Sequence, residues 1–121
     1  MEYLFMVIKA FIFISIVNVW IFRFNKPTPY RGGAASSMKE EFANYGLSVP
    51  ILYMVGGLKL LAATLIFISI WIPHLLLYGA APMAILMLGA IAMHIKIKDD
   101  FKKSIPAITF LILSIILILN Q

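Results

Sequence analysis

The stretch that decides the fold is VPILYMVGGLKLLAATLIFISIW, residues 49–71, in which Lys59 is the one charged side chain. Its length satisfies the requirement of about 20 apolar residues for a helix that crosses the hydrocarbon core of a membrane. Similar apolar runs occupy residues 4–24, 75–95 and 105–119. The last run covers only about 22 Å as a helix, a shortfall that local thinning of the bilayer can absorb. We therefore predict an all-α fold, a transmembrane four-helix bundle that forms a single domain over the whole chain.

The composition identifies lipid as the solvent of these helices. Of the 121 residues, 63% are hydrophobic and only 12% are charged, and a soluble domain of this size cannot bury so much apolar surface. The net charge is +5, but the basic residues stand at the ends of the apolar runs, as they do in the loops of membrane proteins. We therefore expect the lipid bilayer as a partner and no nucleic acid.

Missing residues and motifs exclude several classes of chemistry. The chain has no cysteine, which excludes disulfides, thiolate zinc sites and iron–sulfur clusters. The two histidines, His74 and His94, would lie about 30 Å apart along one helix, so they cannot hold one haem together. The sequence contains no phosphate-binding glycine motif and no H-x-x-x-H or E-x-x-H pair. We expect no metal, no haem and no catalytic residue, and nothing predicts an enzyme that acts on its own.

The first loop, residues 25–47, is the longest polar stretch and should contain a short amphipathic helix. Ser37 followed by Glu40 forms a capping-box pattern, which marks a helix start, and Gly46 marks the helix end. The apolar face of this helix is formed by residues spaced i, i+4 and i+7: Met38, Phe42 and Tyr45. We expect the helix at residues 38–45 to lie on the membrane surface or to plug the mouth of the bundle.

The distribution of basic residues predicts the orientation in the membrane. They gather in the first and third loops and their flanks: Arg23, Lys26, Arg31, Lys39, Lys96, Lys98, Lys102 and Lys103. Both loops lie on the same side of a four-helix protein, and the positive-inside rule places that side in the cytoplasm and both termini outside. We expect a multi-pass protein of the cell membrane, with a bacterial inner membrane as the favoured setting.

The third apolar run carries a signal for close helix packing. Pro82 lies inside this run and predicts a kink, which membrane helices tolerate. It follows the small residues Gly79, Ala80 and Ala81, which allow a neighbouring helix to approach closely.

Lys59 is the most informative candidate site residue. It lies about 16 Å into the bilayer if its helix begins at Ser48, and an ammonium group at that depth costs about 3 kcal/mol on insertion scales. It should therefore face the interior of the bundle, where Gly56 on the same side permits close packing. One interpretation is a cation that binds an anionic or carbonyl group of a ligand; the other is a structural ion pair with Glu40 or Glu41.

Other polar and aromatic residues have both functional and structural interpretations. His94, at the cytoplasmic end of the third run, is either a proton carrier or ligand contact or an ordinary interface histidine. Asn18 can form a hydrogen bond across the bundle and is a possible partner for Lys59. Trp20 and Trp71 are typical of the aromatic belts at the membrane interfaces.

Three segments of the chain, in order and spacing, resemble the DoxX and DoxX-like membrane proteins. The resemblance is clearest at residues 41–47, which include Tyr45, at residues 53–60 and at residues 87–94. The family pattern has "G-L-P" before the second helix, and here the proline is displaced to Pro50. The charged position within the second helix is Lys59, as in one branch of the family, whereas the other branch has glutamate there.

The resemblance implies a four-helix bundle of about this length. The family takes its name from a subunit associated with a quinol oxidase and with thiosulfate:quinone oxidoreduction. We expect a non-catalytic accessory subunit, assembly factor or small-ligand-binding membrane protein. Its site would lie between the second and third helices at Lys59, His94 and Gly56, closed by the helix at residues 38–45. A partner membrane protein or a homo-oligomer is possible.

Two alternatives stay open. The first is a quinone-linked membrane redox component, in which Lys59 and His94 bind the carbonyls of a quinone and a partner supplies the electrons. The second is a small proton-coupled exporter like the small multidrug resistance transporters. The exporter is the least favoured function, because those proteins need a glutamate inside the first helix, and this first run offers only Lys9 and Asn18.

Overall fold

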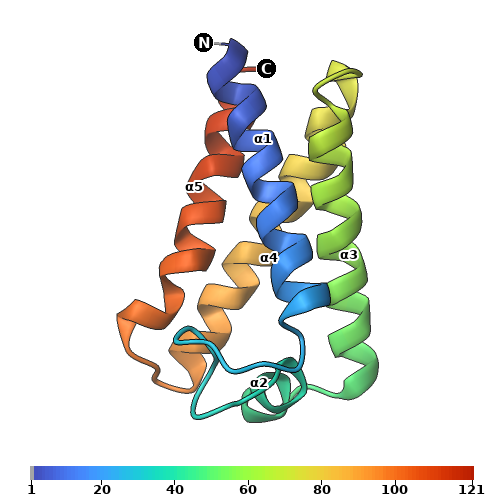
Figure 1. Cartoon of the computed structure of the whole chain (residues 1–121). Coiled ribbons are helices and arrows are strands. Elements are labelled where there is room, and N and C mark those ends of the chain that lie inside the picture. The colour runs from blue at the N-terminus through green and yellow to red at the C-terminus, as the bar shows by residue number, and fades with distance from the viewer. Residues whose placement is uncertain (1) are drawn as a thin grey trace.

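The computed structural model describes residues 2–121, and every regular element in that range is helical (Figure 1). The long helices are α1 (Glu2–Val17), α3 (Val49–Ile68), α4 (Leu76–Lys96) and α5 (Ile105–Leu119), and the short elements are the π-helical turn η1 (Asn18–Phe22), α2 (Met38–Tyr45), and the 3-10 turns η2 (Pro73–Leu75) and η3 (Phe101–Ser104). Together with the turns that extend them, the long helices form four segments that are long and apolar enough to cross a membrane. The predicted all-α bundle with a helix in its first loop is confirmed.

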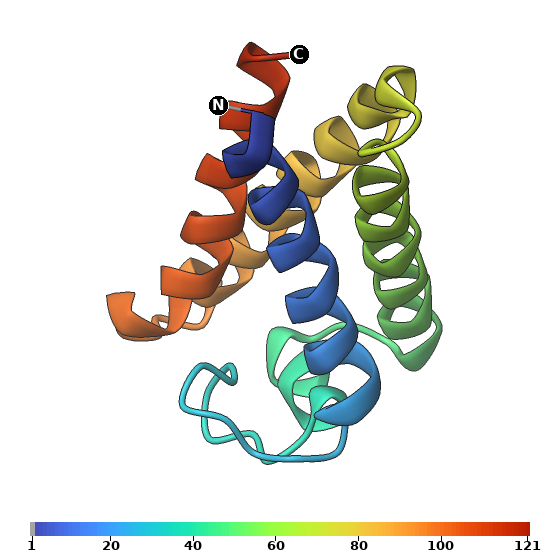
Figure 2. The same cartoon turned by 45° about the horizontal axis from the view of Figure 1, so that its top comes forward.

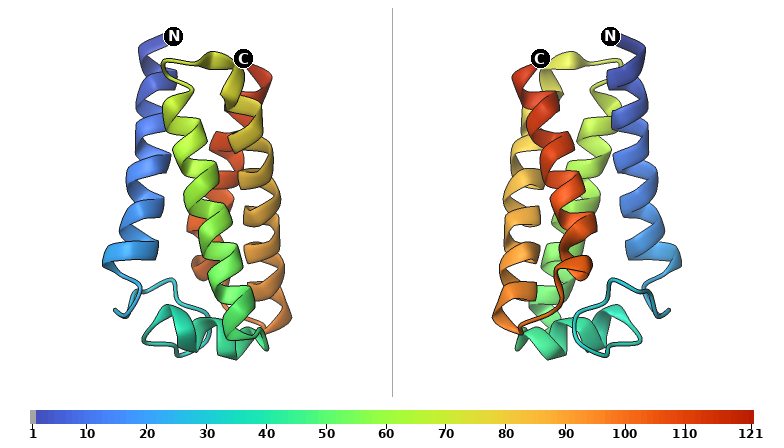
Figure 3. Two further views of the ribbon diagram at one scale, coloured as in Figure 1. Left: turned by 90° about the vertical axis from the view of Figure 1, so that its right-hand side faces the viewer. Right: turned by 90° about the vertical axis from the view of Figure 1, so that its left-hand side faces the viewer.

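The helices α1, α3, α4 and α5 run side by side, and α2 lies across one end of the bundle (Figures 1 and 3). Both ends of the chain lie at the opposite end of the bundle. Helix α3 packs against α1 and α4, and α4 packs against α5. The short helix α2 therefore closes the end of the bundle at which the first and third loops meet.

Helices α1 and α5 draw apart toward the α2 end of the bundle (Figures 1 and 2). They contact each other through the stacked rings of Phe11 and Phe110, whose centroids are 5.9 Å apart. At the α2 end, α1 continues into η1, where the Arg23 N–H donates to the Asn18 carbonyl at 2.8 Å. The predicted first run is thus helical to Phe22, but its last turn is π-helical.

Local sequence signals explain why α2 forms where it does. The Glu40 N–H donates to the Ser37 hydroxyl at 3.2 Å, which caps the start of the helix. Gly46 follows the last turn with φ of 80°, the left-handed conformation that ends many helices. Met38, Phe42 and Tyr45 are all buried, so the predicted apolar face of α2 packs against the bundle.

Candidate functional site

A cavity of about 630 Å³ lies at the α2 end of the bundle, and its volume is within the range of small-molecule sites. Its walls come from α1, α3, α4 and α5, and its floor comes from the first loop and α2. Most of its lining is apolar, and the polar exceptions include Lys59 from α3 and His94 from α4. The cavity therefore has the composition of a ligand pocket, an apolar enclosure with a few polar groups.

The cavity opens at the flank of the bundle. Ile85 on α4 and Asn18 in η1 both border it and are exposed. Both residues belong to segments that are apolar enough to span a membrane. These two residues therefore mark a side of the cavity that is open at the depth of the membrane-spanning segments.

Lys59 reaches the cavity beside an aromatic wall. Its Nζ lies 5.4 Å from the centroid of the Trp20 ring, a distance at which the ring face attracts a cation. Among the side chains that the structure describes, residues 3–121, its ammonium group forms no hydrogen bond and no ion pair. The Glu40 carboxylate instead accepts from the hydroxyls of Ser36 and Ser37, and Glu41 is paired with Arg31. Neither carboxylate forms the predicted alternative, an ion pair with Lys59.

Gly56 positions Trp20 against α3. A Cβ atom at Gly56 would lie 2.5 Å from both Cε3 and Cζ3 of Trp20, so only glycine leaves room for this ring. Gly56 therefore permits close packing as predicted, and the group that packs against it is the Trp20 ring. Trp20 is buried and does not lie exposed at a membrane interface, whereas Trp71 is exposed. Gly56 thus acts on the cavity through the ring that faces Lys59.

We expect Gly56→Ala to displace Trp20 and to destabilise the bundle by about 2 kcal/mol, because overfilling a packed core is costly. Gly57→Ala is the matched control, since a Cβ atom at Gly57 meets nothing within 4 Å. The measurement is unfolding in detergent, with Trp20 emission recorded in a Trp71→Phe background. Equal stability and equal emission of the two variants would contradict this packing.

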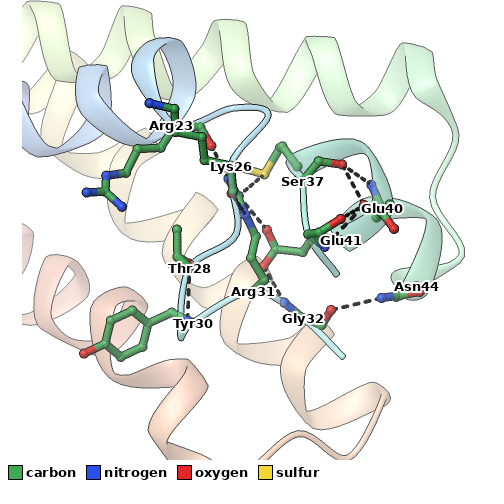
Figure 4. A network of polar contacts seen from close by, with 12 residues as sticks. Arg23, Lys26, Thr28, Tyr30, Arg31, Gly32, Ser37, Glu40, Glu41 and Asn44 are labelled. Carbon is green, nitrogen blue, oxygen red and sulfur yellow. Dashed lines mark hydrogen bonds and ion pairs between the residues drawn. The ribbon is translucent and has the colours of Figure 1, made fainter. Parts of the chain in front are cut away.

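The floor of the cavity is held by a cluster around the Glu41 carboxylate, the Glu41 cluster (Figure 4). Glu41 accepts from Nη1 of Arg31 at 3.2 Å, from the Gly32 N–H at 2.9 Å and from the Tyr45 hydroxyl at 2.8 Å. The other guanidinium nitrogens of Arg31 bond the carbonyls of Arg23 and Lys26. Arg31 and Glu41 are both buried, so the first loop folds over α2 around a buried ion pair.

A second pair, His94 and Asp99, ties the third loop to this floor. Nδ1 of His94 lies 2.7 Å from the Asp99 carboxylate, which also accepts from the Gly33 N–H at 3.0 Å. Nζ of Lys103 lies 3.8 Å from the same carboxylate. On its other side, Nε2 of His94 lies 3.4 Å from the Tyr45 hydroxyl. The polar groups therefore form a continuous chain from the first loop through α2 and α4 to the third loop.

These contacts determine where the protons lie on three members of this chain of polar groups. Burial and the nearby Glu41 carboxylate raise the pKa of Tyr45, so its hydroxyl keeps its proton and donates it. Burial acts to raise the pKa of Asp99, but the bonds from His94 and the Gly33 N–H and the charge of Lys103 outweigh it and lower that pKa. An ionised Asp99 only accepts, so Nδ1 of His94 carries a proton.

The candidate site residues fall into three groups: those that border the cavity, one that lies behind its wall, and one that lies outside it. Lys59, His94, Asn18, Glu41 and Tyr45 all border the cavity, although Asn18 forms no side-chain bond to Lys59 within the described range. Gly56 lies behind the Trp20 ring, whereas Glu40 is exposed and stabilises the start of α2.

Sequence reasoning missed Arg31, Asp99 and Trp20 as parts of the site. Arg31 was predicted only as a basic residue of the first loop and Trp20 only as an interface residue, and no role was predicted for Asp99. One signal was present for Arg31: the two glycines that follow it supply backbone N–H groups to carboxylates, Gly32 to Glu41 and Gly33 to Asp99.

Residues 32–117 match the DoxX-like family. The chain belongs to the DoxX-like family. The family assignment and the four apolar helices make it a multi-pass membrane protein. Searches of curated proteins and of solved structures gave no significant match. In this DoxX-like protein the matched range contains α2, α3, α4 and all but the last two residues of α5, and it includes Lys59 and His94. The Trp20 ring comes from a segment that precedes the matched range.

Proposed function

We propose that this DoxX-like protein is a non-catalytic membrane protein that binds a small lipid-soluble molecule, with the polar group of that molecule at Lys59. The observation that carries the proposal is a cation at the wall of an apolar cavity, with an aromatic ring as its neighbour and no acceptor within residues 2–121. Removing a cation from water is costly unless a partner compensates it. A ligand that supplies an anionic or carbonyl group gives Lys59 that partner.

The setting that we propose follows from the charges of the loops. The first and third loops carry the basic residues and would face the cytoplasm, with both termini outside, in a bacterial inner membrane. The cavity would then lie in the cytoplasmic half of the bilayer, because the first loop and α2 form its floor. Its ligand would enter sideways from that leaflet, between α1 and α5.

The test is native mass spectrometry of protein extracted gently from its own membrane, with lipid extraction of whatever co-purifies. We expect a discrete small molecule on the wild-type protein and at least a 10-fold lower occupancy in Lys59→Met, because the ammonium group holds its polar end. Lys9→Met is the matched control: it removes a lysine at the other end of the bundle, where Nζ of Lys9 donates to the Ser69 carbonyl at 3.4 Å.

Two results would contradict the proposal that Lys59 holds a small ligand. One is a molecule that is retained equally by wild type, Lys59→Met and Lys9→Met. The other is a stoichiometric protein partner with no small molecule, which would make the protein an accessory subunit and Lys59 a structural residue.

A quinone-linked redox component is the second candidate function. It is favoured because Lys59 and His94 border the same cavity, so a quinone bound there would lie beside an ammonium donor and a histidine. The chain contains no cysteine, so a partner would have to supply the electrons. Quinone in the lipid extract, together with slower quinol oxidation in membranes that lack the protein, would support this function; protein without quinone would remove it.

A further inference from the structure

The charges on the cavity wall do not balance. The charged side chains that border the cavity are Arg23, Arg31, Glu41, Lys59 and Lys103. Arg31 is paired with Glu41, and Lys103 lies beside Asp99. Lys59 and Arg23 form no ion pair with a carboxylate within residues 3–121. They are therefore the two cations at the cavity that are not in an ion pair with a described carboxylate, and Lys59 stands in the apolar surroundings where charges interact most strongly.

The two uncompensated cations lie at different places along the route into the cavity. Lys59 extends from the middle of α3 beside the Trp20 ring. Arg23 follows η1 and is exposed, and its side chain extends away from Arg31 and Glu41 (Figure 4). An anion that enters from the flank therefore meets a cation at the rim of the cavity and a second cation inside.

The rest of the wall accommodates a hydrocarbon chain. The neighbours of the cations are apolar side chains of α1, α4 and α5, among them Ile16, Leu86 and Phe110. The open flank faces the membrane at Ile85, so a chain can leave the cavity directly into lipid. A neutral carbonyl compound would accept one hydrogen bond here but would leave both positive charges uncompensated.

We infer that the ligand is an anionic amphiphile, with its charged head between Lys59 and Arg23 and its chain between α1 and α5. This inference rests on the proposed function and narrows it from any lipid-soluble molecule to one class. It predicts that binding depends on the charge of the head group at constant chain length.

The experiment compares hexadecyl phosphate with hexadecanol, which carries the same chain without the charge. Full-length protein is placed in nanodiscs of phosphatidylcholine at pH 7, and the dissociation constants are corrected for partitioning into lipid. We expect hexadecyl phosphate to bind at least 10-fold more tightly than hexadecanol. Lys59→Met should abolish this preference, whereas Lys9→Met should keep it.

The outcomes separate this inference from the proposed function. Equal affinity for the two probes would overturn the anionic ligand and leave binding of a lipid-soluble molecule standing; no binding of either probe would overturn both. A further arm adds phosphatidylglycerol to the nanodisc. Displacement of hexadecyl phosphate would support an anionic bilayer lipid as the source of the head group, and the absence of displacement would support a free single-chain anion.

Discussion

Glu41→Gln is expected to open the first loop and to raise its rate of tryptic cleavage about 100-fold. The substitution keeps the shape of the side chain but removes the negative charge that Arg31 faces. Arg31 is only 3% exposed, so its guanidinium would stay buried without a counter-ion. Removing one partner of a buried pair costs about 3 kcal/mol or more, and each 1.4 kcal/mol is a factor of ten.

Cleavage after Lys39 in detergent-solubilised protein measures this opening, because proteolysis follows the population of the open form when closing is fast. Glu40→Gln is the matched control, since its exposed carboxylate bonds only Ser36 and Ser37 within the described chain. We expect the control to change cleavage less than 10-fold. Similar cleavage of the two variants would show that the Arg31–Glu41 pair does not hold the loop.

A double variant separates charge from packing at the same site. In Arg31→Met with Glu41→Gln no charge is left unpaired, so its cleavage rate should lie below that of Glu41→Gln alone. Such non-additivity is the signature of two groups in direct contact. An additive effect would mean that Glu41 acts mainly through Gly32 and Tyr45.

The elements that the sequence predicts well are those with local physical causes. The membrane helices follow from continuous apolar runs, and α2 follows from the Ser37 cap, the Gly46 stop and three apolar residues on one face. Each of these signals acts within a few residues of the structure that it determines. This is why the bundle and its loop helix could be derived without any knowledge of tertiary contacts.

The site depends on contacts between distant parts of the chain, and such contacts are difficult to predict from the sequence. Lys59 was found because a charge inside an apolar run is costly wherever it lies, but its neighbour is Trp20 from η1 and not a carboxylate. The Gly33–Asp99 bond joins residues 66 positions apart. No periodicity or spacing encodes which loop carboxylate meets which loop donor, so the pairing of Arg31 with Glu41 and of His94 with Asp99 could not be predicted.

A close approach of α3 and α4 at Gly79 gives the second large prediction, at a position far from the Glu41 cluster. A Cβ atom at Gly79 would lie 2.6 Å from the carbonyl oxygen of Ala62 and 2.9 Å from the backbone nitrogen of Ile66. This agrees with the prediction that small residues before Pro82 let a neighbouring helix approach. Backbone atoms of a helix cannot rotate aside as a side chain does, so a larger residue must push the helices apart.

Gly79→Leu is therefore expected to lower the free energy of unfolding by about 3 kcal/mol, at the upper end of the usual cost of overpacking. Gly57→Leu introduces the same side chain on α3 at an exposed site where a Cβ atom meets nothing within 4 Å, and leucine is favourable against lipid. Equilibrium unfolding in detergent should thus leave the Gly57 variant close to wild type. Because α3 carries Lys59 and α4 carries His94, Gly79→Leu should also lower ligand occupancy although it lies outside the cavity lining. Equal stability of the two leucine variants would mean that α3 and α4 do not approach as closely as described.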